Sequence, residues 1–300
     1  METSGVHPDE SVRVEGLPSS ANSPPSGPTT SDSVPPETLT WTYRHALPVR
    51  VGHWINAISL IILIMSGLQI FNAHPALYWG NRSDHNEALL SIRPVRIEGG
   101  NIKGITTILG HLFDTTGILG YSDQTVRAFP AWATIPGPRW LAMGRQWHLF
   151  FAWIFVLTGL LFVSYSVASR HLSRDLLPSR WDMRGIGRAI QDHFFFRHAA
   201  GEAARRYNVL QKLAYIAVLF GLAPLIVLTG LSMSPTIDAA FPSLLHLFGG
   251  RQGARTIHFI ACFTFVGFIV IHVFQVIITG CFNNLRSMIT GWFAIKEARQ

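Results

Sequence analysis

Charged residues are scarce in this chain of 300 residues: only 14% are Asp, Glu, Lys or Arg, while 48% are hydrophobic. A typical soluble protein carries about 25% charged residues. Lysine is nearly absent, so the net charge of +7 comes mostly from arginine. Because this positive charge adjoins apolar runs, it indicates membrane orientation and does not point to a nucleic-acid partner.

Cysteine is also scarce, with Cys262 and Cys281 as its two occurrences. They lie 19 residues apart, in or beside one apolar run, so they cannot bridge along a continuous helix. The chain lacks Cys-x-x-Cys-His, which excludes a covalently attached c-type haem. It also lacks the Cys-x-x-Cys pairs typical of iron–sulfur clusters.

The first 42 residues lack any apolar run. Residues 1–40 hold seven prolines and eight serines, a composition typical of disorder. Because this segment has no hydrophobic stretch like that of a signal peptide, we expect it to stay in the cytoplasm. We therefore predict a cytoplasmic tail at 1–42, a membrane domain at 43–290 and a short cytoplasmic tail at 291–300.

Apolar runs, in contrast, are long and frequent. Four of them reach the roughly 20 residues needed to cross a bilayer. They lie at about 51–73, 146–169, 211–234 and 256–280. The alternative is a large soluble helical core, but such a core would have to contain four such runs by chance. The expected fold class is therefore all-α, an integral membrane bundle of four transmembrane helices in a lipid bilayer.

The loops set the expected orientation. Residues 170–208 carry eight arginines, whereas the loop at about 74–145, nearly twice as long, carries seven basic residues. The positive-inside rule places 170–208, and with it both termini, in the cytoplasm. The long loop then faces the other side. Its tryptophans, Trp79, Trp132 and Trp140, predict a cap at the membrane interface.

Four of the thirteen histidines fall within the predicted spans. They are His53, His148, His258 and His272. Intramembrane polar side chains usually face the bundle interior and are functional, although an interhelical hydrogen bond is an alternative for any one of them. The last two are 14 residues apart, which is nearly four turns, or about 21 Å along one helix face.

Topology sorts these histidines by depth. The first span starts inside and the second and fourth start outside, so His53 pairs with His272 and His148 pairs with His258. Each level then offers two imidazoles from different helices, as bis-histidine ligation of haem iron requires. A structural zinc site usually needs four ligands at one level, so two haems fit better.

A second pattern is a small hydroxyl residue followed by glycine in each span. The four pairs are Ser66-Gly67, Thr158-Gly159, Thr229-Gly230 and Thr279-Gly280. Two interpretations stay open. The glycines could make room for the edge of a macrocycle, or they could serve ordinary close packing of helices.

The stretch from Pro48 to Ala57, PVRVGHWINA, resembles the start of the first helix in the membrane b-type cytochrome subunits of nickel–iron hydrogenases. Formate dehydrogenase and thiosulfate reductase have related subunits, which together form the bacterial cytochrome b561 superfamily. The resemblance covers about residues 43–290, and it implies the four histidines as ligands of two haem b groups, the metal being haem iron. Segments 206–212 and 251–258 look closest to the thiosulfate-reductase branch.

The resemblance further implies a subunit of the bacterial inner membrane that carries electrons between quinone and a periplasmic molybdopterin oxidoreductase. It makes Asn208 a candidate quinone residue, or alternatively a helix cap. Arg50, Arg145 and Arg255 are candidates for haem propionates or headgroup anchors. Two other functions stay open: a free-standing oxidase of superoxide or quinol, and a haem-free anchor or transporter.

Overall fold

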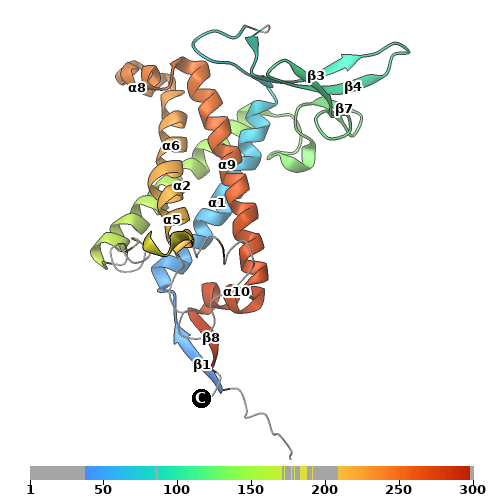
Figure 1. Ribbon diagram of the computed structural model, residues 1–300. Helices are drawn as coiled ribbons and strands as arrows, with labels where there is room; N and C mark the ends of the chain where they lie inside the picture. The colour runs from blue at the N-terminus through green and yellow to red at the C-terminus, as the bar shows by residue number, and fades with distance from the viewer. Residues whose placement is uncertain are drawn as a thin grey trace, which may run out of the picture.

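Four long apolar helices dominate the computed structural model (Figure 1). The structure describes residues 38–84, 87–170 and 209–297, together with 172, 177, 179, 183–187 and 191. The candidate spans are α1 (Leu47–Phe71), α2 (Leu141–Ala168), the composite helix Val209–Ser232 and α9 (Gly250–Ile278). The predicted bundle of four membrane helices is confirmed, with helix starts a few residues earlier than expected.

The third span is not a regular helix. It consists of α5 (Val209–Ile216), a π-helical stretch (Ala217–Leu222) and α6 (Ala223–Ser232). Pro224 lies two residues after the π-helical stretch, in the first turn of α6. Its ring would clash with the carbonyl of residue 220, and it has no N–H to donate, so wider turns before it relieve the conflict. The span therefore continues through the proline.

Burial in the spans is the reverse of that in a soluble core. Large apolar side chains point outward, among them Leu161 at 71% and Val270 at 63% exposure. Small hydroxyl residues are enclosed instead, with Ser66 and Thr229 at 0%. Lipid satisfies the apolar exterior, while small residues let helices approach closely.

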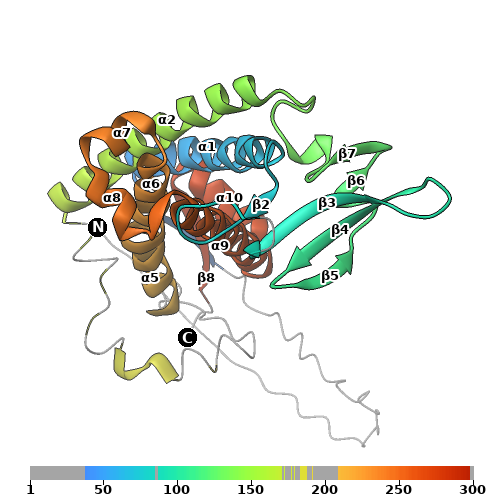
Figure 2. The same cartoon turned by 90° about the horizontal axis from the view of Figure 1, so that it is seen from above.

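The helices associate as two pairs. Close backbone packing is extensive between α1 and α2 and between α6 and α9. Seen from above, the long helices form a compact group with the sheet to one side (Figure 2). Any contact between residues of α1 or α2 and residues of α9 therefore joins one pair to the other.

The expected cap loop folds as β-structure, which the all-α expectation did not include. Its strands are β2 (Ala76–Leu77), β3 (Leu90–Arg96), β4 (Ile102–Ile108), β5 (His111–Asp114), β6 (Gly120–Ser122) and β7 (Thr125–Arg127). The first four form an antiparallel sheet in that order, and β6 pairs with β7. Gly99 and Gly100 turn the chain between β3 and β4 at φ of 92° and 84°, which glycine adopts readily.

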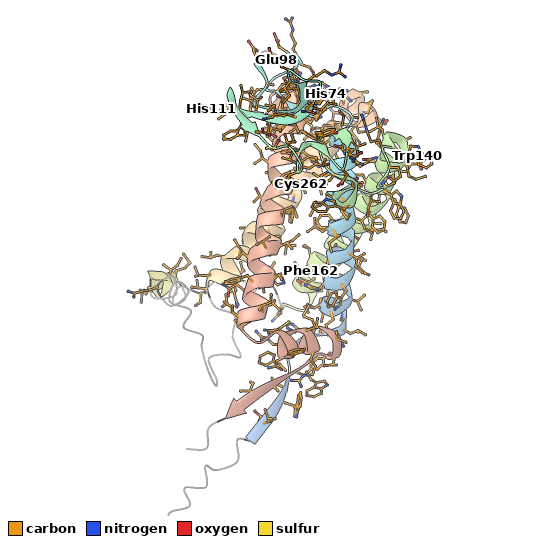
Figure 3. The ribbon with its side chains drawn as sticks, turned by 90° about the vertical axis from the view of Figure 1, so that its right-hand side faces the viewer. His74, Glu98, His111, Trp140, Phe162 and Cys262 are labelled. Carbon is orange, nitrogen blue, oxygen red and sulfur yellow. The ribbon has the colours of Figure 1, made fainter. Side chains whose placement is uncertain are left out.

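The cap is tied to the first turns of α9. The backbone N–H of Gln252 donates to the Gly80 carbonyl at 2.9 Å, and the Thr256 hydroxyl donates to the Tyr78 carbonyl at 2.6 Å. A Cβ on Gly253 would overlap the carbonyl oxygen of Phe248. In Figure 3, His74, Glu98 and His111 lie at this end of the molecule, and Cys262 lies lower on α9. The cap thus fixes the N-terminal end of α9.

A buried arginine joins the cap to α1. Arg127 is 7% exposed and donates to the carbonyls of Phe129 and Gly137, to the Thr134 hydroxyl and to the side-chain oxygen of Gln69 on α1. Burial lowers the pKa of this guanidinium, with a smaller contribution from the nearby positive charge of Arg139. The four acceptors together replace the water that the charge has lost.

A two-stranded ribbon closes the opposite end. β1 (Thr38–Tyr43) pairs antiparallel with β8 (Trp292–Glu297), which follows α10 (Cys281–Thr290). The boundary expected after residue 42 falls inside β1, and the one expected after residue 290 lies just before β8. Cross-strand pairing joins two segments that look like tails when read separately. Residues 1–37 lie outside the described residues.

Two short helices form the remaining connection, between α6 and α9. They are α7 (Pro235–Ala240) and α8 (Pro242–Leu247), and each begins with a proline at a position where a missing N–H costs nothing. α8 packs against both α6 and α9, on the same side of the bundle as the cap (Figure 1).

Candidate functional site

At the end of the bundle away from the cap, two histidines face each other. His53 lies in the second turn of α1, and His272 lies near the end of α9. Their ring centroids are 6.3 Å apart, with ring planes inclined by 53°. This pair joins α1 to α9, and we call it the inner pair after the orientation that the sequence leads us to expect.

A second pair of histidines lies near the cap. His148 lies in the second turn of α2, and His258 lies in the third turn of α9. Their centroids are 6.2 Å apart, and the ring planes are inclined by 62°. The outer pair therefore repeats the spacing of the inner pair, also between α9 and a helix of the other pair.

The two levels are separated by an apolar layer. His258 and His272 are 14 residues apart on one continuous helix, so their levels differ by about 21 Å. Phe265 stands midway between them, is 2% exposed and packs edge-on against Phe155 of α2 at 6.3 Å. This packing places aromatic side chains between the two levels.

The chemistry of the pairs suits haem better than a bare metal ion. Among the residues that the structure describes, no group of three or more His, Cys, Asp or Glu could hold a metal. A structural zinc ion needs about four such ligands, whereas haem iron takes four from its macrocycle and only two axial ligands from the protein. Two histidines at each level match the two protein ligands that haem iron needs.

The outer rings are held by hydrogen bonds that the sequence did not reveal. His148 Nδ1 is 3.1 Å from the Leu63 carbonyl oxygen and 3.1 Å from the Ser66 hydroxyl, both on α1. On the other helix pair, His258 Nδ1 is 3.0 Å from the Ile226 carbonyl oxygen and 3.1 Å from the Thr229 hydroxyl. The hydroxyl–glycine pairs are the feature of the sequence from which these hydrogen bonds could have been predicted.

Among the described residues, His53 of the inner pair has no equivalent contact. His53 Nδ1 is buried and has no hydrogen-bond partner within the described ranges. His272 stacks on Phe268, with centroids 5.8 Å apart and planes 16° from parallel. One turn after His53, Asn56 Oδ1 is also buried without a partner among the described residues. Within the described residues, His53 Nδ1 and Asn56 Oδ1 are therefore available for further hydrogen bonds.

Two of the three candidate arginines contact backbone carbonyls. Arg255 donates to the carbonyls of His74 and Ala76 and lies over the Phe71 ring. Arg50 donates to the Ile289 carbonyl of α10. Both therefore brace helix ends in this structure.

The remaining candidates differ in what the structure records. Arg145 is exposed in the second turn of α2, three residues before His148. Asn208, the candidate quinone residue, lies outside the described residues, one position before α5.

Four apolar spans with pairs of half-buried histidines between them define a membrane cytochrome of the b type. The chain belongs to the prokaryotic cytochrome b561 family, whose model matches residues 44–291. It is a multi-pass membrane haem protein that functions in electron transfer.

Among curated proteins, the chain is similar to the putative protein-methionine-sulfoxide reductase subunit YedZ1 of Azospira oryzae. The two are 26% identical over 245 residues, which cover 81% of this chain and 93% of the relative. The similarity therefore extends over nearly the whole relative.

Proposed function

We propose that the chain carries electrons across the membrane through two b-type haems, each held by one of the histidine pairs. The observation that carries this proposal is the spacing of the rings. Two metal–imidazole bonds of about 2 Å, with about 1.1 Å from each nitrogen to its ring centre, put axial rings about 6.2 Å apart. The two pairs measure 6.3 Å and 6.2 Å.

Haem, when bound, supplies reversible one-electron chemistry. The chain's own residues set where that chemistry occurs: one site near each membrane surface, about 21 Å apart, with the Phe265 layer between them. Arg145 is the propionate candidate with an exposed side chain, while Arg50 and Arg255 would have to give up carbonyl partners.

The outer site would serve a periplasmic redox subunit, and the cap is the surface nearest to it. The relative from Azospira is named as a subunit of a protein-methionine-sulfoxide reductase, which supports a partner that is itself an oxidoreductase. We propose a molybdopterin enzyme as this partner. Since a reductase consumes electrons, they would flow outward, in a bacterial inner membrane with both termini in the cytoplasm.

The inner site would exchange electrons with quinone. Asn56 Oδ1, one turn from His53 and without a partner in the part of the chain that the structure describes, offers an acceptor for a quinol hydroxyl, in addition to the candidate Asn208. Asn56→Leu should slow reduction of the haems by a quinol analogue at least tenfold while leaving haem content unchanged. An unchanged rate would remove Asn56 from the quinone site.

Haem content tests the central proposal. The purified chain should bind two haems and show low-spin bis-histidine absorption and electron paramagnetic resonance signals. His272→Ala should remove the inner haem and leave one, and His148→Ala should remove the outer haem. His246→Ala, in the last turn of α8, is the matched control and should keep both. A single haem in the native chain, or two in His272→Ala, would refute the pairing.

A further inference from the structure

The two outer histidines rest in matching polar cradles. On α1 the cradle consists of Leu63, Ser66 and Gly67. On α6 it consists of Ile226, Thr229 and Gly230. In both, a backbone carbonyl lies three residues before a hydroxyl, and a glycine follows the hydroxyl directly. We call these units the outer cradles.

The hydrogen bonds of the cradles have a defined direction. The Thr229 hydroxyl donates its hydrogen to the carbonyl of Leu225 at 2.7 Å, within its own helix. The Ser66 hydroxyl similarly donates to the Leu63 carbonyl at 3.2 Å. Each hydroxyl oxygen is then left as an acceptor, beside a carbonyl that also accepts. Both rings must therefore carry hydrogen on Nδ1, which leaves Nε2 unprotonated and able to bind a metal.

The glycines let the rings come close. A Cβ at Gly67 would lie 3.4 Å from Cε1 of His148, and a Cβ at Gly230 would lie 3.3 Å from Cε1 of His258. Gly67 and Gly230 therefore make room for the imidazoles themselves, which is neither of the two interpretations that the sequence left open. Carbonyl, hydroxyl and glycine together fix the position and rotation of each ring.

An identical sequence in α2 does not form such a cradle. Residues 156–160 of α2 and 227–231 of α6 share the sequence VLTGL. In α2, however, the Thr158 hydroxyl donates to the Ile154 carbonyl at 2.7 Å, and a Cβ at Gly159 would meet nothing within 4 Å. The cradle therefore depends on a histidine from the neighbouring helix, which makes Thr158 a matched internal control.

We propose that Ser66 and Thr229 are positioning residues that orient the outer axial histidines and hold the reduction potential of the outer haem below that of the inner haem. This inference rests on the proposed function. An acceptor on Nδ1–H makes the imidazole a stronger ligand, which favours ferric iron. The outer rings have two acceptors each, whereas His53 Nδ1 has none within the described ranges.

Potentiometric titration of the purified chain tests this asymmetry. Ser66→Ala and Thr229→Val each remove one acceptor and keep the shape of the side chain. We expect their double variant to favour reduction of the outer haem by about tenfold, a rise of about 59 mV for one electron. The inner haem should not change. Thr229→Ser should restore the native value, and Thr158→Val should leave both potentials as they are.

The haem signals are assigned with the variants of His148 and His272. An unchanged outer potential in both single variants, with two haems still bound, would overturn the proposal, as would an equal shift in Thr158→Val. Loss of the outer haem alone in the double variant would support the positioning role, with the single variants then reporting the potential. A native chain without two bis-histidine haems would instead contradict the proposed function.

Discussion

Replacing Arg127 with methionine should loosen the cap without disturbing the membrane helices. The guanidinium donates four hydrogen bonds, at 2.6 Å to Phe129, 2.8 Å to Gly137, 2.8 Å to Thr134 and 3.3 Å to Gln69. Methionine keeps much of the length of the side chain but can donate none of them. All four acceptors would lose this donor, in a site where the arginine is 7% exposed, although Phe129 and Gln69 also accept from the side-chain amide of Asn72.

The size of this effect follows from two opposing terms. Hydrogen bonds to a charged group each contribute about 1.5–3 kcal/mol, so four set an upper limit of about 6–12 kcal/mol. The unfolded cap, however, returns the guanidinium to water, which recovers several kcal/mol of lost hydration. We therefore expect Arg127→Met to lower the free energy of unfolding of the cap by about 3–5 kcal/mol.

Hydrogen exchange of the protein in lipid nanodiscs, read by mass spectrometry over residues 88–138, measures this opening directly. Arg139→Met is the matched control, because Arg139 is exposed and makes one bond of 3.3 Å to the Val126 carbonyl. Arg139→Met should lower the free energy of unfolding of the cap by less than about 1 kcal/mol. If Arg127→Met costs no more than its control, the buried arginine does not hold the cap.

Three further outcomes follow from the structure. Gly104→Ala should prevent the cap from folding, because its Cβ would overlap the carbonyl oxygen of Leu119, and increased proteolysis of the cap would show it. Hydrogen bonds from Lys103 and Thr116 lower the pKa of Asp114 to about 2. The stabilising contribution of this carboxylate is therefore complete above about pH 4 and is lost as the pH falls to about 2. In unfolding followed by tryptophan fluorescence, Asp114→Asn should be less stable than the native cap at pH 7 and equal to it near pH 2. Asn283→Ala loses two hydrogen bonds to the β8 backbone, at 2.8 Å and 3.0 Å, and should destabilise the terminal ribbon by about 2 kcal/mol, visible as faster hydrogen exchange there.

Span number and histidine level could be predicted because both depend on local rules. A bilayer requires about 20 apolar residues per helix whatever surrounds them. The helix repeat places His258 and His272 on one face at a spacing that needs no knowledge of the neighbours. Alternation of span direction then predicts the partner of each. The structure brings the same pairs together at 6.3 Å and 6.2 Å.

The cap could not be predicted in the same way. Its strands are short, and their register depends on cross-strand partners such as Ser91 with Thr107. The ribbon of β1 and β8 joins residues 249 to 259 positions apart, so each strand alone resembles a tail. Arg127, which the sequence offers as one of seven basic residues in a loop, is buried where three acceptors of the following cap segment and one on α1 converge on it.

The hydroxyl–glycine pattern shows most clearly what the sequence determines and what depends on the tertiary structure. The sequence by itself determined four membrane helices and two levels of paired histidines, because hydropathy and helical periodicity are properties of each segment alone. Only the tertiary structure decided that Thr229 faces a histidine while Thr158, within an identical pentapeptide, does not. The physical reason is that a hydrogen bond to an imidazole depends on the rotation and depth of a neighbouring helix, and packing between helices sets both.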